Sequence, residues 1–343
     1  MLRSIVALAA GALLACGLQA ASAQEFNEIQ AVIKPQLALE RARELRRIMR
    51  NRSAELLHRR MDPDGQDIAP LFYGEGGQVP AEDTSPEPIG VNLWLEASGG
   101  RLEDNAPLRA YDGTQFIVTA GADRSFGERL ILGVLGVHSG NDIDNVFVPG
   151  SSSTRGLGAG GYGAVFLTDT VIMTGSVLHI WTDNEAGSGV VTAAYDSREW
   201  TGNLAVTSYH FSGDWQFAPS VGISYSQERD DAYTDSFATF NAASTTRTGS
   251  VSFGAKAAYT HVMDNGVSVE PSLEAEGEWI FERSTTATSS MAPDTSDFDA
   301  SVTAGIDLAI SEAVSLSFSG TVSGLARSDY ISTTGGGRLS VSF

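Results

Sequence analysis

From residue 91 to the C-terminus, apolar and polar residues alternate along the chain. The clearest stretch is 267–282, where Val267, Leu273 and Trp279 share one face and a file of glutamates occupies the other. A period of two residues is typical of a β-strand with one apolar and one polar face. This strand would be about three times longer than the usual soluble strand of roughly five or six residues.

Twelve such stretches occur, and short and long connections alternate between them. Long strands with short turns at one end and longer loops at the other are typical of outer-membrane barrels. The sequence therefore predicts an all-β fold over residues 89–343: a 12-stranded antiparallel transmembrane β-barrel with both chain ends on the periplasmic side. The expected strands are about 90–99, 114–125, 129–140, 154–168, 170–184, 195–211, 214–229, 247–263, 266–283, 297–311, 313–326 and 333–343.

We expect the apolar face of each strand to meet lipid, because an Arg or Lys at the bilayer centre costs about 2–4 kcal/mol. A soluble ligand-carrying barrel would have the opposite arrangement, with its apolar side chains inside. As a set, aromatic residues near strand ends, including Trp94 and Trp181, indicate interfacial girdles, whereas for any single one of them ordinary packing is the favoured interpretation. The polar face would line the lumen, where the predicted acidic residues are Glu270, Glu274, Glu276 and Glu278.

The first 23 residues have the pattern of an export signal. Arg3 precedes an apolar stretch, and the small residues Ala21 and Ala23 form a cleavage site. Residues 13–16 also resemble a bacterial lipobox, so lipidation of Cys16 is the alternative to cleavage after Ala23. Cys16 is the only cysteine, which excludes an intrachain disulfide.

Residues 24–61 form a basic segment rich in the helix formers Leu, Ala, Arg and Glu. Residues 34–60 carry nine cations and three anions, although the whole chain has a net charge of −20. The segment 62–88, with five prolines, is predicted to be a Pro/Gly-rich linker. The helix cations singled out are Arg41, Arg43, Arg46, Arg47, Arg50 and Arg52.

This asymmetry of charge suggests that the basic helix threads an acidic lumen and plugs it. Ion pairs in such a confined, partly dry pore would be stronger than surface pairs. The alternative is a helix that stays in the periplasm, on a membrane surface or a protein partner. The barrel would then be a narrow diffusion porin that prefers cations.

No residue pattern points to catalysis. None of the five histidines lies in a nucleophile-elbow or zinc-protease motif, and the acidic runs 141–145 and 228–231 lack the spacing of a calcium loop. We therefore expect no enzyme, no metal and no cofactor, and the sequence identifies no small-molecule ligand. The acidic balance disfavours nucleic acid as a partner.

Residues 92–100, 111–113, 121–123 and 130–134 are similar to the opening strands of the autotransporter (type V secretion) translocator β-barrel. The resemblance covers about 88–343 and implies a barrel threaded by a helix in the bacterial outer membrane. It also implies contact with outer-membrane lipids, the barrel-assembly machinery and periplasmic chaperones. Only residues 24–88 precede the barrel, so we expect a relative that lacks a large passenger. The C-terminal Leu339, Val341 and Phe343 resemble the assembly signal of outer-membrane proteins.

Overall fold

The computed structural model describes residues 33–51, 54, 91–106, 110–127, 129–146, 150–188, 191–286, 296–311 and 313–343. The predicted signal with Cys16, Ala21 and Ala23, the linker 62–88, and Arg52 lie outside the described residues. A helix covers residues 33–51, and it is called the lumen helix below. In the part of the chain that is described, no helix is both long enough and apolar enough to cross a membrane.

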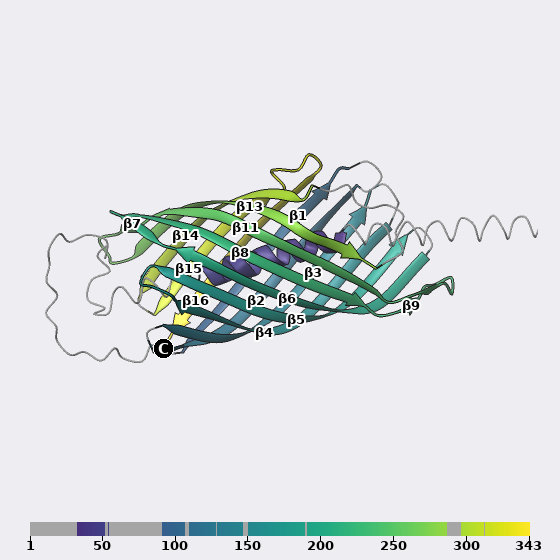
Figure 1. Cartoon of the computed structure of the whole chain (residues 1–343), viewed down its shortest axis with the longest axis horizontal. Coiled ribbons are helices and arrows are strands. Elements are labelled where there is room, and N and C mark those ends of the chain that lie inside the picture. The colour runs from purple at the N-terminus through teal and green to yellow at the C-terminus, as the bar shows by residue number, and fades with distance from the viewer. Residues whose placement is uncertain are drawn as a thin grey trace, which may run out of the picture.

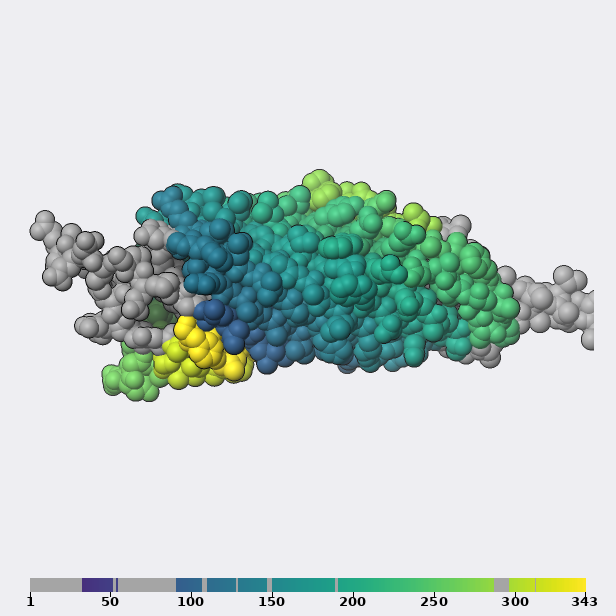
Figure 2. All heavy atoms as spheres, turned by 90° about the horizontal axis from the view of Figure 1, so that it is seen from below, coloured from purple at the N-terminus to yellow at the C-terminus, as the bar shows by residue number. Residues whose placement is uncertain are grey.

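Twelve long antiparallel strands form a closed barrel (Figure 1), as predicted. β1 pairs with both β2 and β16, and β8 pairs with both β6 and β11, so the ring has no free edge. Figure 2 shows the yellow C-terminal strand beside the blue first strands at this seam. The strands are β1 (Asn92–Asp104), β2 (Tyr111–Phe126), β3 (Leu130–Asn145), β4 (Gly150–Phe166), β5 (Val171–Ser188), β6 (Val191–Ser208), β7 (His210–Ser212), β8 (Trp215–Asp230), β9 (Tyr233–Thr234), β10 (Phe240–Asn241), β11 (Ser244–Tyr259), β12 (His261–Val262), β13 (Ser268–Thr285), β14 (Phe298–Ser311), β15 (Val314–Ser323) and β16 (Tyr330–Ser342).

Four of the sixteen strands do not add to the ring. β7 follows β6 after a break at Tyr209, and it pairs with β8 as β6 does. β12 likewise follows β11 and pairs with β13. β9 and β10 pair only with each other, as a hairpin in the loop after β8.

The apolar face of the strands is the outer surface of the barrel. On β13, Leu273 is 58% exposed and Trp279 is 52% exposed, whereas Glu274 and Glu278 are buried on the inner face. The outer face is therefore apolar and the inner face is polar, as the alternation predicts.

Several strands extend further than predicted at the end that carries the longer loops. β1 continues to Asp104 rather than 99, and β3 continues to Asn145 rather than 140. The outward side chains of these extensions are charged, and Arg155 donates two hydrogen bonds to Asp142 at 2.8 and 2.9 Å. Apolar alternation stops where a strand leaves the lipid, but strand pairing continues, so the pattern underestimates strand length.

The short turns have the chemistry that the sequence predicts. Gly213 has a φ of 63° and Gly266 has a φ of 84°, both in the left-handed region that glycine adopts without steric cost. They lie in the connections from β7 to β8 and from β12 to β13. Tight turns therefore lie at one end of the barrel, and longer loops lie at the other.

Candidate functional site: the helix-filled lumen

The lumen helix lies inside the barrel, where the purple ribbon is visible behind the strands (Figure 1). Ile33, Leu39 and Ile48, which point in different directions around the helix, are each no more than 2% exposed. Burial around the whole circumference means that the barrel wall encloses the helix. The periplasmic location that the sequence left open is not the one observed for residues 33–51.

One side of the lumen helix is apolar and packs on an apolar patch of the wall. Leu45, Ile48 and Met49 form a buried cluster with side chains of β1, β3, β4 and β5. This patch was not predicted, because the alternating pattern indicates an inner face that is polar throughout. The wall residues of the cluster are Trp94, Leu135, Val137, Tyr162, Leu178 and Ile180.

Trp94 belongs to this patch and is not a girdle residue, so for this member of the aromatic set the alternative of ordinary packing holds. It is 3% exposed, and its Nε1 donates a hydrogen bond of 2.7 Å to the hydroxyl of Tyr162. Leu93 and Leu95 take the outer face of β1, so alternation turns Trp94 inward. Gly121 opposite makes room for the ring, since a Cβ there would lie 2.4 Å from Trp94 atoms.

The lumen helix also carries cations that face wall carboxylates. At the end with the longer loops, Lys34 forms ion pairs with Glu228 at 3.0 Å and with Asp230. Arg41 pairs with Glu199 at 2.7 Å. Glu199, Glu228 and Asp230 were not predicted as helix partners, although they occupy polar positions of alternating strands.

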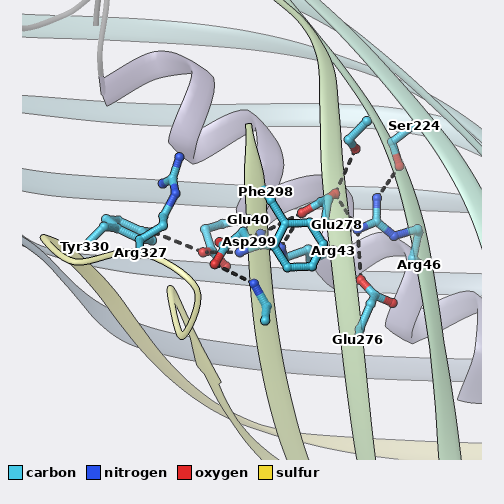
Figure 3. A network of polar contacts seen from close by, with 12 residues as sticks. Glu40, Arg43, Arg46, Ser224, Glu276, Glu278, Phe298, Asp299, Arg327 and Tyr330 are labelled. Atoms are coloured by element: carbon cyan, nitrogen blue, oxygen red, sulfur yellow. Dashed lines mark hydrogen bonds and ion pairs between the residues drawn. The ribbon is translucent and has the colours of Figure 1, made fainter. Parts of the chain in front are cut away.

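Arg43 lies at the centre of the contact (Figure 3). Its guanidinium contacts Glu278 at 2.6 Å and Asp299 at 2.7 Å, on two neighbouring strands. It also pairs with Glu40, one turn earlier on the helix, at 2.9 Å. Glu40 in turn accepts a hydrogen bond of 3.0 Å from Tyr330 of β16.

Glu278 joins two helix arginines. Besides Arg43, it contacts Arg46 at 2.8 Å and accepts a hydrogen bond of 2.7 Å from Ser250. Arg46 also pairs with Glu276 at 3.1 Å and donates to the hydroxyl of Ser224. With only 1% of its surface exposed, Glu278 has these partners in place of water.

The ion pairs continue toward the end with the short turns. Arg47 pairs with Glu96 of β1 at 2.7 Å. Arg50 pairs with Glu274 and, at 3.4 Å, with Glu276. Six helix cations thus contact carboxylates of β1, β6, β8, β13 and β14, and we call this set the ion-pair ladder. Its members are Lys34, Arg41, Arg43, Arg46, Arg47 and Arg50 on the helix and Glu96, Glu199, Glu228, Asp230, Glu274, Glu276, Glu278 and Asp299 on the wall.

A barrel closed around a helix agrees with the comparison to known families, in which the autotransporter beta-domain matches residues 93–321. The chain belongs to this family. Family membership places this β-domain in the bacterial outer membrane, in contact with lipid.

Solved autotransporter barrels have the same fold as this β-domain. The beta domain of Bordetella BrkA is 20% identical, with a TM-score of 0.61 over 74% of this chain and 100% of that one. The NalP translocator of Neisseria meningitidis is 11% identical, with a TM-score of 0.62 over 74% and 89%. The AIDA-I transport unit of Escherichia coli is 14% identical, with a TM-score of 0.58 over 84% and 98%. A search of curated proteins found no match.

The direction of the lumen helix in this β-domain follows from the ladder. Asp230, which pairs with Lys34, is the last residue of β8 before the β9–β10 loop, whereas Glu274, which pairs with Arg50, lies deeper in the barrel. Long loops of outer-membrane barrels face the exterior and short turns face the periplasm. The N-terminal end of the helix therefore points toward the cell exterior.

Glu270 also faces the lumen and is 7% exposed. It forms an ion pair of 3.5 Å with Lys256 of the neighbouring strand, and Lys256 also contacts Asp307 at 3.3 Å. The wall of this β-domain therefore supplies a cation of its own to the lumen, beside those of the helix.

The acidic runs considered as calcium ligands have other partners. Asp142 is held by Arg155 on the outer surface, and Glu228 is held by Lys34 in the lumen. Among the residues that the structure describes, no group of three or more His, Cys, Asp or Glu is placed to hold a metal ion. The polar chemistry of the lumen is therefore ion pairing between helix and wall.

Proposed function

We propose that the barrel is an outer-membrane translocator of the autotransporter type and that the lumen helix keeps it closed. The ion-pair ladder is the observation that carries this proposal. A buried ionic group is costly unless a partner compensates it, so cations and carboxylates in this number favour a helix that stays in the lumen. The narrow porin has no observation in its favour over the closed barrel.

Little open space remains beside the helix. A cavity of about 70 Å³ lies between the helix and the wall, near Gln115 and Ser139. Since one water molecule needs about 10–15 Å³ of cavity volume measured in this way, the space holds on the order of five waters. Ion flow past the seated helix should therefore be small.

Planar-bilayer conductance tests the closed state. Deletion of residues 34–60 should raise the conductance of the folded barrel, and the exposed pair variant Asp142→Asn/Arg155→Gln should leave it unchanged. Heat-modifiable gel mobility verifies that each barrel is folded. A folded deletion variant with the conductance of the full chain would contradict the proposal.

The direction of the helix supports a route for the chain. The described helix begins at residue 33 near the outer rim, whereas the barrel wall begins at residue 91 on the side of the short turns. Limited proteolysis of whole cells tests this: a protease site inserted before residue 33 should be cut from outside, and one inserted in 62–88 should not. The opposite result would reverse the proposed orientation.

We also propose that the C-terminal strand is read by the barrel-assembly machinery and periplasmic chaperones. Leu339 and Phe343 are exposed on the outer side, at 41% and 75%, and β16 closes the ring against β1. Phe343→Ser should lower the amount of folded barrel in the outer membrane while leaving refolding in detergent unchanged. Equal amounts of folded barrel in cells would refute this role.

No catalytic step is proposed, in keeping with a family of secretion domains.

A further inference from the structure

Three outward-facing arginines lie together near the outer rim, on neighbouring strands. Arg198 of β6 and Arg229 of β8 are direct partners in the strand register, and Arg247 of β11 is opposite Gln227 of β8. All three side chains are exposed. We call them the arginine cluster.

The arginine cluster lies where a strand passes from lipid to water. Trp200 follows Arg198 on the outer face of β6, and Trp181 is the register partner of Arg198 on β5. Both tryptophans are more than half exposed. Outward aromatic residues of outer-membrane barrels mark the membrane interface, so the cluster is at the height of lipid headgroups.

The guanidinium groups of the cluster are only partly paired with carboxylates, although Asp183 and Asp196 are exposed on the same outer face beside Arg198. Arg198 has one carboxylate, Asp231, at 3.5 Å. Arg247 donates a 3.3 Å hydrogen bond to the neutral Gln227, and within the described residues Arg229 has no ion-pair partner. Like charges directly opposite each other on neighbouring strands are destabilising, so the pair of Arg198 and Arg229 favours an added anion.

The other outward arginines at this rim are neutralised. Arg101 contacts Glu103 at 2.9 Å and Asp112 at 3.0 Å. Arg155 is held by both carboxylate oxygens of Asp142. These two arginines therefore differ from Arg229, which has no ion pair among the described residues.

We propose that the arginine cluster binds a phosphorylated headgroup of an outer-leaflet lipid. Guanidinium groups bind phosphate oxygens through paired hydrogen bonds, and three of them at one height can hold a headgroup with more than one phosphate. The tryptophans below would contact the upper part of the acyl chains. The site lies on the outer wall and is independent of the lumen helix.

Native mass spectrometry of the refolded full chain in detergent tests the site, with diphosphorylated lipid A and its dephosphorylated form as probes. Each arginine near a membrane surface contributes about 1 kcal/mol to such binding, so Arg198→Gln/Arg229→Gln/Arg247→Gln should weaken binding of the phosphorylated lipid about a hundredfold. Arg229→Gln alone should weaken it about fivefold.

The matched control is Arg101→Gln/Arg155→Gln, which removes arginines of the same rim that already have carboxylate partners. It should bind the phosphorylated lipid as the unchanged chain does. Equal loss in control and triple variant, no loss in the triple variant, or equal binding of the dephosphorylated probe would each overturn the proposal.

Discussion

Replacing Glu278 with Gln should loosen the closed state of the barrel more than replacing an exposed carboxylate. Gln keeps the size of the side chain but removes the negative charge that Arg43 and Arg46 share, at 2.6 and 2.8 Å. Removing one partner of a buried ion pair costs about 3–5 kcal/mol. Both arginines keep a second carboxylate, so we expect the low end of that range.

A cost of about 3 kcal/mol corresponds to about a hundredfold change in the ratio of closed to open barrels. Single-channel recording in planar bilayers measures this ratio directly, as the fraction of time in a conducting state. The open fraction of Glu278→Gln should exceed that of the unchanged chain by about this factor. Asp142→Asn is the control, because this exposed carboxylate pairs outside the lumen and surface pairs contribute about 0–1 kcal/mol.

A second substitution distinguishes lost ion pairing from general damage. Arg46→Gln in the Glu278→Gln background removes one of the guanidiniums left without its shared carboxylate. The increase in open fraction of the double variant should therefore be smaller than the product of the increases in the two single variants, because the effects of substitutions at contacting residues are not additive. Strictly additive effects, or an open fraction of Glu278→Gln within about threefold of the unchanged chain, would refute the role of the ion-pair ladder in holding the barrel closed.

Three further substitutions test other parts of the structure. Leu273→Arg places a charge on the lipid face and should destabilise the folded barrel by about 2–4 kcal/mol in urea unfolding from lipid vesicles, whereas an unchanged midpoint would argue against lipid contact there. Gly121→Val should cost about 1–3 kcal/mol in the same assay, since the added Cβ meets Trp94; a stable variant would mean that the ring moves freely. Lys34→Gln should broaden the distribution of distances between spin labels on the lumen helix and on the wall. An unchanged distribution would show that Lys34 does not fix the position of the helix along the barrel axis.

The strand pattern could be predicted because it follows from contact with two solvents. Lipid excludes charge from one face and lumen water favours polar groups on the other, so Leu273 and Glu274 show their directions in the sequence. Local pattern could not reveal which carboxylate meets which cation. Lys34 and its partner Glu228 are separated by 194 positions, and the closed ring alone brings them together.

The apolar patch in the lumen was missed for a related reason. On β3, Leu135 and Val137 face inward while Leu132 and Val134 face outward. Because both faces are apolar there, alternation does not distinguish a lipid contact from a helix contact. The residue type of Trp94 fits a girdle, but its neighbours Leu93 and Leu95 on the outer face indicate that it points inward.

The spacing of the helix cations explains why Lys34 matters for register. A shift by one turn, about 5.4 Å, would bring Arg47 or Arg50 near the positions of Arg43 and Arg46, so the central carboxylates would still have partners. The same shift outward would place Ala38, in place of Lys34, opposite Glu228 and Asp230. Lys34 therefore distinguishes the observed register from its neighbours, whereas the central arginines contribute attraction that several registers could satisfy. In coiled coils a single buried polar residue specifies the register at a cost in stability, and Lys34 at the end of this ladder has the asymmetry that such a role requires.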